Sequence, residues 1–253
     1  MPETALYLVA TPIGDDGDLS PRGTRLLLEA KLVIGEEFRP LTTILKRIGR
    51  PRVTPDPKVR PPELPDLEVL NEHSKPEDVK YLADRVIAIH KAGGFTALVS
   101  DCGTPGFCDP GAPLVAELRR RGYTSSAAPG ASALMCLLSV AGTRLDQFVF
   151  RGFLPASRDE REVSLKDLAR ETRALVVMDT PYRLEKLLGE LATAVPNRQA
   201  TLGCDFTSEK ERIYQGTVPE LVKIWNEKPA DERKAEFMIL LHPLAAAASN
   251  VRK

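Results

Sequence analysis

The chain has 253 residues, enough for one large α/β domain or two smaller ones. Its 43% hydrophobic and 28% charged residues are typical of ordinary globular proteins, and no run approaches the ~18 consecutive apolar residues of a membrane span. Thirty-five Lys and Arg residues balance 35 Asp and Glu residues, and this zero net charge argues against a broad, non-specific nucleic-acid binder. The N-terminus has no basic segment of a secretory signal, so we expect a cytoplasmic protein.

The four cysteines and three histidines give little reason to expect a metal site. Cys102 and Cys108 are six residues apart, a step that matches no common zinc spacing. His73, His90 and His242 are scattered along the chain and supply no partner pair. We therefore expect no metal and reduced thiols.

Apolar runs alternate with helical periodicity through the first half of the chain. Strands are expected at residues 5–10, 31–35, 67–73 and 95–100, and helices at 20–30, 39–49, 74–94 and 112–122. Ser20 is expected to cap the first helix, and Ser74 with Glu77 to form a capping box. This βαβα order predicts a parallel sheet. The six prolines of residues 50–66 predict an exposed connector or, alternatively, a semi-rigid flap beside a site.

The second half repeats the mixture of strands and helices. A short strand and an apolar helix follow residue 123, and strands are expected near 147–155, 173–178, 200–205, 211–217 and 235–241. The helix at 157–172 carries charges of both signs, which predicts a solvated face. We predict an N-terminal α/β domain at 1–124, a C-terminal α/β domain at 125–243 and a disordered tail at 244–253.

Two loops directly follow buried strands. They are TPIG at 11–14 and SDCGTPGFCDPG at 100–111. A plain turn needs one Gly or Pro, whereas the second loop has five around two carboxylates, which indicates a rigid loop shaped to lie against something. Ligands of parallel α/β sheets bind beyond the carboxyl ends of the strands, so both loops are candidates for a site.

The motifs LVATPIG, SDCGTPGFCDPG, APGASA, RGFLP, DTPYR and EFMILL stand in this order between Leu6 and Leu241. With them the chain resembles the tetrapyrrole (corrin/porphyrin) methylase superfamily. It is most similar to the branch of small-subunit ribosomal RNA methyltransferases that modify a cytidine 2′-hydroxyl with S-adenosylmethionine. The resemblance implies two α/β domains with the cofactor cleft between them, usually in a homodimer.

The resemblance also implies which residues bind S-adenosylmethionine. The glycines would let the main chain approach the cofactor closely. The implied cofactor-binding residues are Pro12, Gly14, Ser100, Asp101, Gly103, Thr104, Pro105, Ser132, Ala133 and Met178.

Three stretches depart from the pattern of the ribosomal RNA branch. Its Cys-Glu-Asp-Thr-Arg is Gly35–Arg39 here, and its Glu-Ser-Pro-His-Arg is Asp179–Arg183, with Tyr182 in place of His. Its Arg-Glu-x-Thr-Lys is Cys204–Ser208, which removes two positive charges. The departures concern the substrate more than the fold or the cofactor.

Methyl transfer from a sulfonium is an in-line displacement, so holding the nucleophile and the methyl group in line supplies most of the catalysis. A sugar hydroxyl is a poor nucleophile, and a group that accepts its proton should accelerate the reaction by roughly 10²–10⁴-fold. The candidates are Glu36 first, then Glu37, Glu72 and His73.

Arg39 and Arg183 suit RNA phosphates, because guanidinium groups bind two phosphate oxygens at once. Either could instead form an ion pair between domains. The expected partner is ribosomal RNA or the small ribosomal subunit.

Two other functions stay open. A methyltransferase acting on a tetrapyrrole or another small molecule would need an apolar, aromatic-lined cavity, although aromatic residues make up only 6% of the chain. The altered Gly35–Arg39 stretch also allows a non-catalytic S-adenosylmethionine-binding protein.

Overall fold

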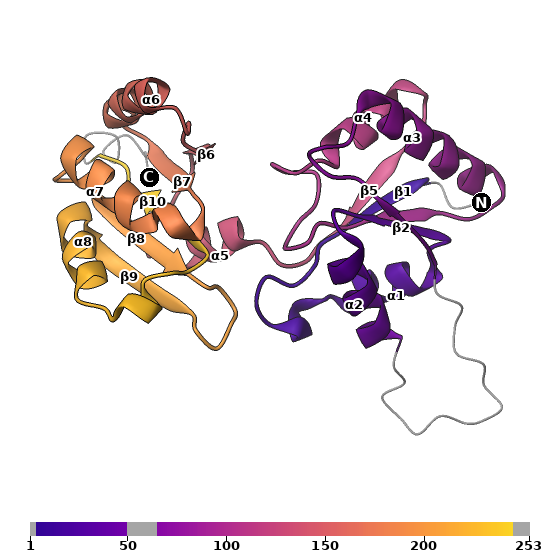
Figure 1. The fold of residues 1–253 in the computed structure, drawn as a ribbon, viewed down its shortest axis with the longest axis horizontal. Coiled ribbons are helices and arrows are strands. Elements are labelled where there is room, and N and C mark those ends of the chain that lie inside the picture. Colours follow the sequence, from indigo (N-terminus) through magenta and orange to yellow (C-terminus); the bar gives the residue numbers. More distant parts are fainter. Residues whose placement is uncertain (1–3, 50–64, 245–253) are drawn as a thin grey trace, which may run out of the picture. The chain divides into compact units, whose positions relative to one another are not determined.

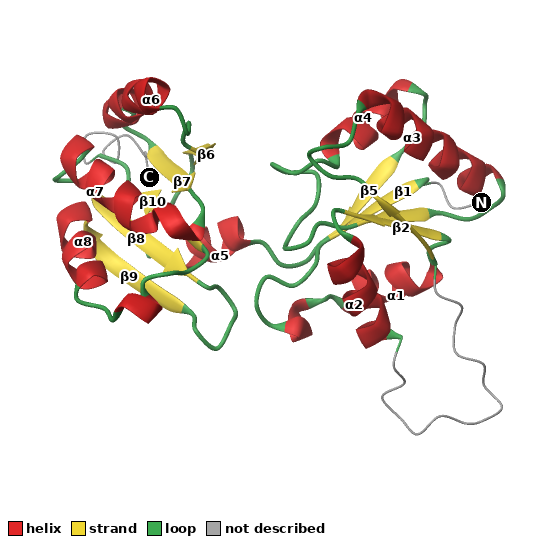
Figure 2. Ribbon diagram, in the orientation of Figure 1, coloured by secondary structure: helices red, strands yellow, loops and turns green. Residues whose placement is uncertain are grey.

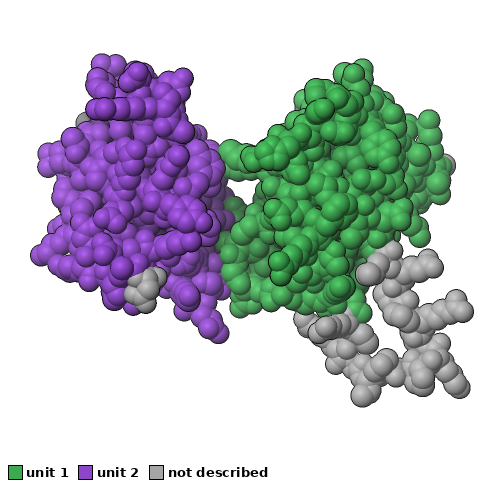
Figure 3. Space-filling model, in the orientation of Figure 1, with its two compact units in different colours: residues 1–132 green, residues 133–253 purple. Residues whose placement is uncertain are grey.

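The computed structural model describes residues 4–49 and 65–244. Most of the predicted connector or flap at 50–66, and the predicted tail beyond residue 244, lie outside the described residues. The chain forms two compact units, Met1–Ser132 and Ala133–Lys253 (Figure 3). Each unit contains one five-stranded sheet.

The sheet of the first unit is entirely parallel, as predicted. Its strand order is β3-β2-β4-β1-β5. Figure 1 shows its strands β1, β2 and β5 between the helices α3 and α4 on one side and α1 and α2 on the other. The strands are β1 (Leu6–Val9), β2 (Leu32–Gly35), β3 (Asp66–Val69), β4 (Thr96–Leu98) and β5 (Ser125–Ala128).

Two pairs of helices cover the two faces of this sheet (Figure 2). Leu32 and Ile34 of β2 pack with the helices on one face, whereas Val33 packs with those on the other, because successive strand residues point to opposite faces. Burial on both faces explains the continuous apolar sequence of β2. The pairs are α3 (Pro76–Lys91) with α4 (Ala112–Arg120), and α1 (Pro21–Glu29) with α2 (Phe38–Ile48).

One predicted helix cap is confirmed and one is wrong. The hydroxyl of Ser20 accepts a hydrogen bond from the backbone N–H of Gly23 at 3.0 Å, which caps α1. Pro76 occupies the first position of α3, so the carboxylate of Asp78 accepts from the N–H of Lys75 at 2.8 Å. Ser74 lies outside the helix, where its hydroxyl accepts from the N–H of Asn71.

The structure divides the chain eight residues beyond the predicted start of the second domain. Strand β5 pairs with β1 along its whole length, from Leu6 opposite Ser125 to Val9 opposite Ala128. The short sequence Ser-Ser-Ala-Ala therefore completes the first sheet rather than opening the second unit.

The second unit has a mixed sheet with the order β6-β7-β10-β8-β9. Only the pair β6 and β7 is parallel. The strands are β6 (Phe148–Phe153), β7 (Ala174–Met178), β8 (Gln199–Cys204), β9 (Arg212–Thr217) and β10 (Phe237–Leu241).

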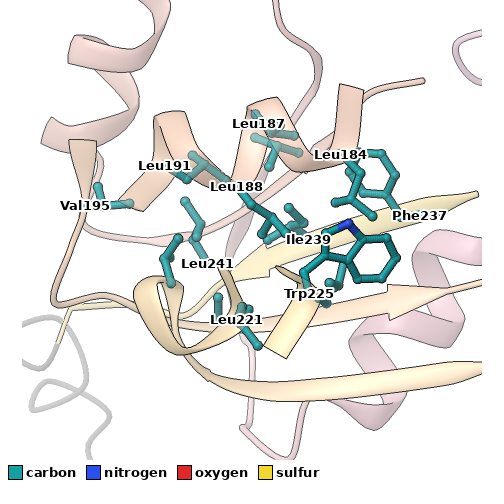
Figure 4. Packing of buried hydrophobic residues seen from close by; sticks show 14 of the residues in the cluster. Leu184, Leu187, Leu188, Leu191, Val195, Leu221, Trp225, Phe237, Ile239 and Leu241 are labelled. Atoms are coloured by element: carbon teal, nitrogen blue, oxygen red, sulfur yellow. The ribbon is translucent and has the colours of Figure 1, made fainter. Parts of the chain in front are cut away.

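Helices α7 (Leu184–Ala194) and α8 (Val218–Asn226) pack on this sheet and form its largest core (Figure 4). Trp225 lies with Leu188 and Ile239 in this cluster, each at most 1% exposed. The remaining helices of the unit are α5 (Ala133–Val140) and α6 (Arg158–Arg170). Short 3₁₀ turns are η1 (Asp16–Asp18), η2 (Pro181–Arg183) and η3 (Ala230–Glu232).

The charged helix α6 departs from the prediction of a solvated face at one position. Arg161 is only 3% exposed and forms ion pairs with Asp179 and Glu190. It also donates to the carbonyl of Pro155. A buried arginine is tolerated here because its donors are met by charged or carbonyl oxygens.

None of the helices in the described part of the chain combines the length and apolar character that crossing a membrane requires.

Candidate functional site

The candidate site of the first unit lies where loops leave the carboxyl edge of the parallel sheet. The loops after β1, β4 and β5 contain the motifs TPIG, SDCGTPGFCDPG and APGASA. All strands of the sheet run in the same direction, so these loops leave from the same edge. Hydrogen bonds join the three loops into one assembly.

Thr11 is the residue that joins the first two loops. Its N–H donates to the carbonyl of Gly103 at 2.8 Å, and its carbonyl accepts from the N–H of Gly103 at 3.2 Å. Its hydroxyl donates to the carbonyl of Ser100 at 3.1 Å. Thr11 is fully buried and was not among the predicted site residues. Its local signal, a Thr between an apolar strand and a Pro, does not distinguish it from a surface threonine.

Gly103 and Gly106 have backbone φ angles of +86° and +83°, which L-residues rarely adopt. A Cβ on Gly103 would lie 3.3 Å from Ile13 Cγ2, and one on Gly106 would lie 2.8 Å from Leu8 Cδ2. Glycine at these positions lets the loop after β4 lie directly against β1 and the loop that follows it.

Two hydroxyl residues stabilise the loop in different ways. Thr104 is exposed and donates to the carbonyl of Ala131 at 3.0 Å, which ties in the loop after β5. Ser100 is buried, and its hydroxyl donates to the carbonyl of Gly103 at 3.1 Å. Ser100 therefore stabilises the loop from its buried side, whereas Asp101 and Thr104 lie on its exposed side.

Acidic side chains gather beside this loop. The carboxylate of Glu36, which follows β2, accepts a hydrogen bond from the N–H of Asp101 at 3.1 Å. Burial raises the pKa of Glu36, and the negative charges of Asp101, Asp109 and Glu37 raise it further. Burial and the charge of Glu37 also raise the pKa of Asp101. The structure thus brings the carboxylates of Glu36, Glu37 and Asp101 close together, where their like charges repel one another.

A pocket of about 370 Å³ opens beside these carboxylates. Its size is in the range of small-molecule sites. Arg39, in the first turn of α2, contributes a positive charge to the same pocket. The lining residues are Pro12, Asp16, Glu37, Arg39, Pro40, Thr43, Ile44 and Asp101.

Other candidate residues stand apart from this assembly. His73 and Glu72 extend into solvent with side chains 84% and 83% exposed, and His73 Nε2 lies 3.6 Å from Glu72 Oε1. They follow β3, the strand beside β2, so their loop leaves the sheet next to the loop of Glu36. Ser132 is the last residue of the first unit.

The remaining candidates, Ala133, Met178 and Arg183, belong to the second unit. Ala133 begins α5, and Met178 ends β7 and is half-buried. Arg183 is 43% exposed, and its guanidinium lies 3.7 Å from Asp179, so the observed ion pair is within its own unit.

The described residues contain no group of three or more His, Cys, Asp or Glu side chains that could hold a metal ion. Cys102 and Cys108 are both exposed, and Cys204 is buried, where burial raises the pKa of its thiol to about 12.

The parallel sheet with glycine-rich loops at its carboxyl edge, followed by a unit with a mixed sheet, defines a two-domain α/β enzyme fold. The chain belongs to the family of Tetrapyrrole (Corrin/Porphyrin) Methylases, whose model matches residues 5–222. It is a methyltransferase of this family.

Curated relatives at 30% identity or more include proteins named Ribosomal RNA small subunit methyltransferase I. The chain is 34% identical over 229 residues to the Ribosomal RNA small subunit methyltransferase I of Leptospira borgpetersenii serovar Hardjo-bovis. The aligned residues cover 89% of this chain and 84% of the relative. The chain is 33% identical over 238 residues to the protein of the same name from Coprothermobacter proteolyticus, covering 94% and 97%.

Solved structures show the same fold at lower identity. A cobalt precorrin-4 methyltransferase of cobalamin biosynthesis matches with a TM-score of 0.60 at 15% identity, over 94% of both chains. The uroporphyrin-III C-methyl transferase of Thermus thermophilus, complexed with S-adenyl homocysteine, matches with a TM-score of 0.57 at 18% identity, over 94% of this chain and 96% of that one. At these identities the likeness concerns the fold alone.

Proposed function

We propose that this chain transfers the methyl group of S-adenosylmethionine to the 2′-hydroxyl of a cytidine in small-subunit ribosomal RNA. The names of the relatives support the RNA substrate, and the resemblance of the motifs supports the position of the methyl group. The observation that carries the proposal is the loop at 100–111, which is tied to Thr11 and whose Asp101 donates its N–H to the carboxylate of Glu36.

The first unit suits this cofactor in two respects. Gly103 and Gly106 have positive φ angles and no Cβ, so the loop keeps a tight main-chain conformation against β1 and the loop that follows it, and we propose this conformation as the cofactor-binding one. Glu36, Glu37 and Asp101 repel one another, and a sulfonium or ammonium group near them would relieve that repulsion. The residues of this unit that we propose to hold the cofactor are Pro12, Gly14, Asp101, Gly103, Thr104, Pro105 and Ser132, with Ser100 buried under the loop. Ala133 and Met178 are proposed from the second unit.

The bound cofactor supplies an electrophilic methyl group, and the protein positions the ribose hydroxyl against it. Glu36 is our first candidate for the group that accepts the hydroxyl proton, because its raised pKa makes it a stronger base than an ordinary carboxylate. Its hydrogen bond to the N–H of Asp101 orients it. Glu37 is the second candidate because it lines the pocket, and the solvent-exposed His73 is the third.

Arg39 is the proposed phosphate contact of the first unit. It lines the pocket with Glu37 and Asp101, so a phosphate held by its guanidinium would place the adjoining ribose near the carboxylates. Arg183 is proposed to contact phosphate from the second unit.

A tetrapyrrole substrate is the second candidate function, because the solved structures that share the fold are named for tetrapyrrole and cobalamin chemistry. The lining of the 370 Å³ pocket, however, includes no aromatic residue among the described ones. A large flat apolar ligand favours aromatic walls, so this lining does not favour a tetrapyrrole.

The resemblance also supports a homodimer, and a ribosomal RNA substrate supports a cytoplasmic location. Sedimentation of the purified chain tests the dimer, with a mass near twice 27.8 kDa expected.

Methylation of small-subunit RNA by the purified chain, with the variants Glu36→Gln and His73→Ala, tests the proposed function. We expect Glu36→Gln to lower kcat by roughly 10²–10⁴-fold and His73→Ala to change it little. Unaltered kcat for Glu36→Gln together with a large loss for His73→Ala would reverse the assignment of the base. Transfer to a tetrapyrrole and none to RNA would contradict the proposed substrate.

A further inference from the structure

The loop that follows β7 exposes an aromatic ring. Tyr182 is 77% exposed, the highest value among the large hydrophobic residues that the structure describes. The ammonium group of Lys234 lies 4.3 Å from the centre of the ring. The ring is therefore accessible from outside the protein, and a cation lies against it.

The main chain beneath this ring is held in place by buried charges. The side chain of Asp179 is fully buried, and its carboxylate accepts from Arg161 at 3.0 Å and from the N–H of Thr180 at 2.9 Å. Pro181 then fixes the first φ angle of the 3₁₀ turn that contains Tyr182. Burying a carboxylate and a guanidinium is costly, and here it yields a stiff turn that presents Tyr182 outward.

The surroundings of the ring favour an anionic partner. Arg183 shares the carboxylate of Asp179 with Arg161, so its charge is only partly balanced. Among the side chains that the structure describes, none forms an ion pair with Lys234. Two acidic groups lie close by. The carboxyl of Glu236 interacts electrostatically with Lys234, and Glu185 Oε2 is 3.9 Å from the guanidinium of Arg233.

We propose that Tyr182 stacks on an unpaired base of the RNA substrate, while Lys234 and Arg183 contact the adjoining phosphates. The inference rests on the proposed function, because it names the recognition surface of that same substrate. Stacking on an exposed aromatic ring beside cations is the usual way in which proteins hold single-stranded RNA. The ammonium group on the ring adds to the attraction, and most of the ring surface stays open to a base.

Binding of a 12-nucleotide single-stranded oligoribonucleotide containing cytidine, followed by fluorescence anisotropy with the full chain, tests the proposal. We expect Tyr182→Ala to raise Kd by about 5- to 150-fold without changing the dependence of Kd on salt. Tyr182→Phe should stay within about two-fold, because it keeps the ring. Lys234→Ala should reduce the salt slope by about 0.7, the value for one phosphate contact on a single strand.

Tyr81→Ala is the matched control, because Tyr81 is a tyrosine 54% exposed on α3 in the other unit. It should leave the RNA affinity unchanged. A Tyr182→Trp variant adds a direct signal: the single native tryptophan, Trp225, is buried, so quenching on RNA addition would report stacking on residue 182.

The outcomes separate this inference from the proposed function. If the wild-type chain methylates small-subunit RNA and Tyr182→Ala binds RNA as well as wild type does, the inference fails and the proposed function stands. If Tyr182→Ala alters the sedimentation coefficient instead of the RNA affinity, the ring is a subunit contact and the inference also fails. If the wild-type chain binds S-adenosylhomocysteine but neither binds nor methylates RNA, the proposed function fails, and the inference with it.

Discussion

Replacing Gly103 with Ala tests whether the loop after β4 forms the cofactor site. Gly103 has φ of +86°, and an L-residue in this left-handed region costs about 1–2 kcal/mol. The added methyl group would lie 3.3 Å from Ile13 Cγ2 and 3.8 Å from the carbonyl oxygen of Ala131, so the steric conflict is small. If the loop keeps its conformation, the strain lowers the free energy of unfolding. If the loop relaxes instead, cofactor binding must restore the original loop conformation.

The methyl group also projects between the loops after β1 and β5. We therefore expect Kd for S-adenosylhomocysteine in calorimetry to rise about 5- to 30-fold, which corresponds to ~1–2 kcal/mol. Gly122→Ala is the matched control, because Gly122 has φ of +85°, nothing lies within 4 Å of its Cβ position, and it precedes β5 at the opposite edge of the sheet. This control should lose about 1–2 kcal/mol in urea unfolding and bind the ligand normally. Equal ligand affinities of both variants and the wild type would refute the assignment of the loop.

Three further predictions follow from buried or crowded charges. Folding raises the pKa of Glu36, so the folded chain holds the carboxyl proton more tightly than the unfolded chain does, and the free energy of unfolding should fall as pH rises above 4.5. In thermal unfolding, Glu36→Gln should reduce this fall. A pH profile unchanged by the substitution would contradict the prediction. Arg161→Met should lower the free energy of unfolding by about 3–5 kcal/mol in urea, because it leaves the buried Asp179 without its guanidinium, and a loss below 1 kcal/mol would contradict the buried pair. Cys204 should resist iodoacetamide at pH 8 while the exposed Cys108 reacts, as read by mass spectrometry, and equal labelling would disagree with the burial of Cys204.

The alternation of strands and helices could be predicted because each element carries a strong local signal. The buried strand β2 is continuously apolar, and Ser20 stands directly before Pro21 at the start of α1. The boundary between the units was harder to place, because β5 is short and its pairing with β1 is a long-range contact that no local pattern reveals.

The candidate site could be proposed from the sequence where its residues lie in one motif. The loop at 100–111 stands out because Gly and Pro punctuate it, and Glu36 was proposed because the resemblance matches Gly35–Arg39 to a motif of the ribosomal RNA branch. Thr11 and Arg161 could not be assigned in this way. Their roles depend on partners 92 and 18 residues away, and a threonine after a strand or an arginine in a charged helix is usually a surface residue.

The most direct test of the central claim is mapping of ribose methylation in small-subunit ribosomal RNA by mass spectrometry, from cells with and without this gene and after treatment of the unmodified RNA with purified protein. We expect one cytidine to gain a methyl group on its 2′-oxygen when the protein and S-adenosylmethionine are present, and the Glu36→Gln variant to leave it unmodified. Identical methylation patterns with and without the gene, and RNA that stays unmodified after incubation with active-site-intact protein, would contradict the account.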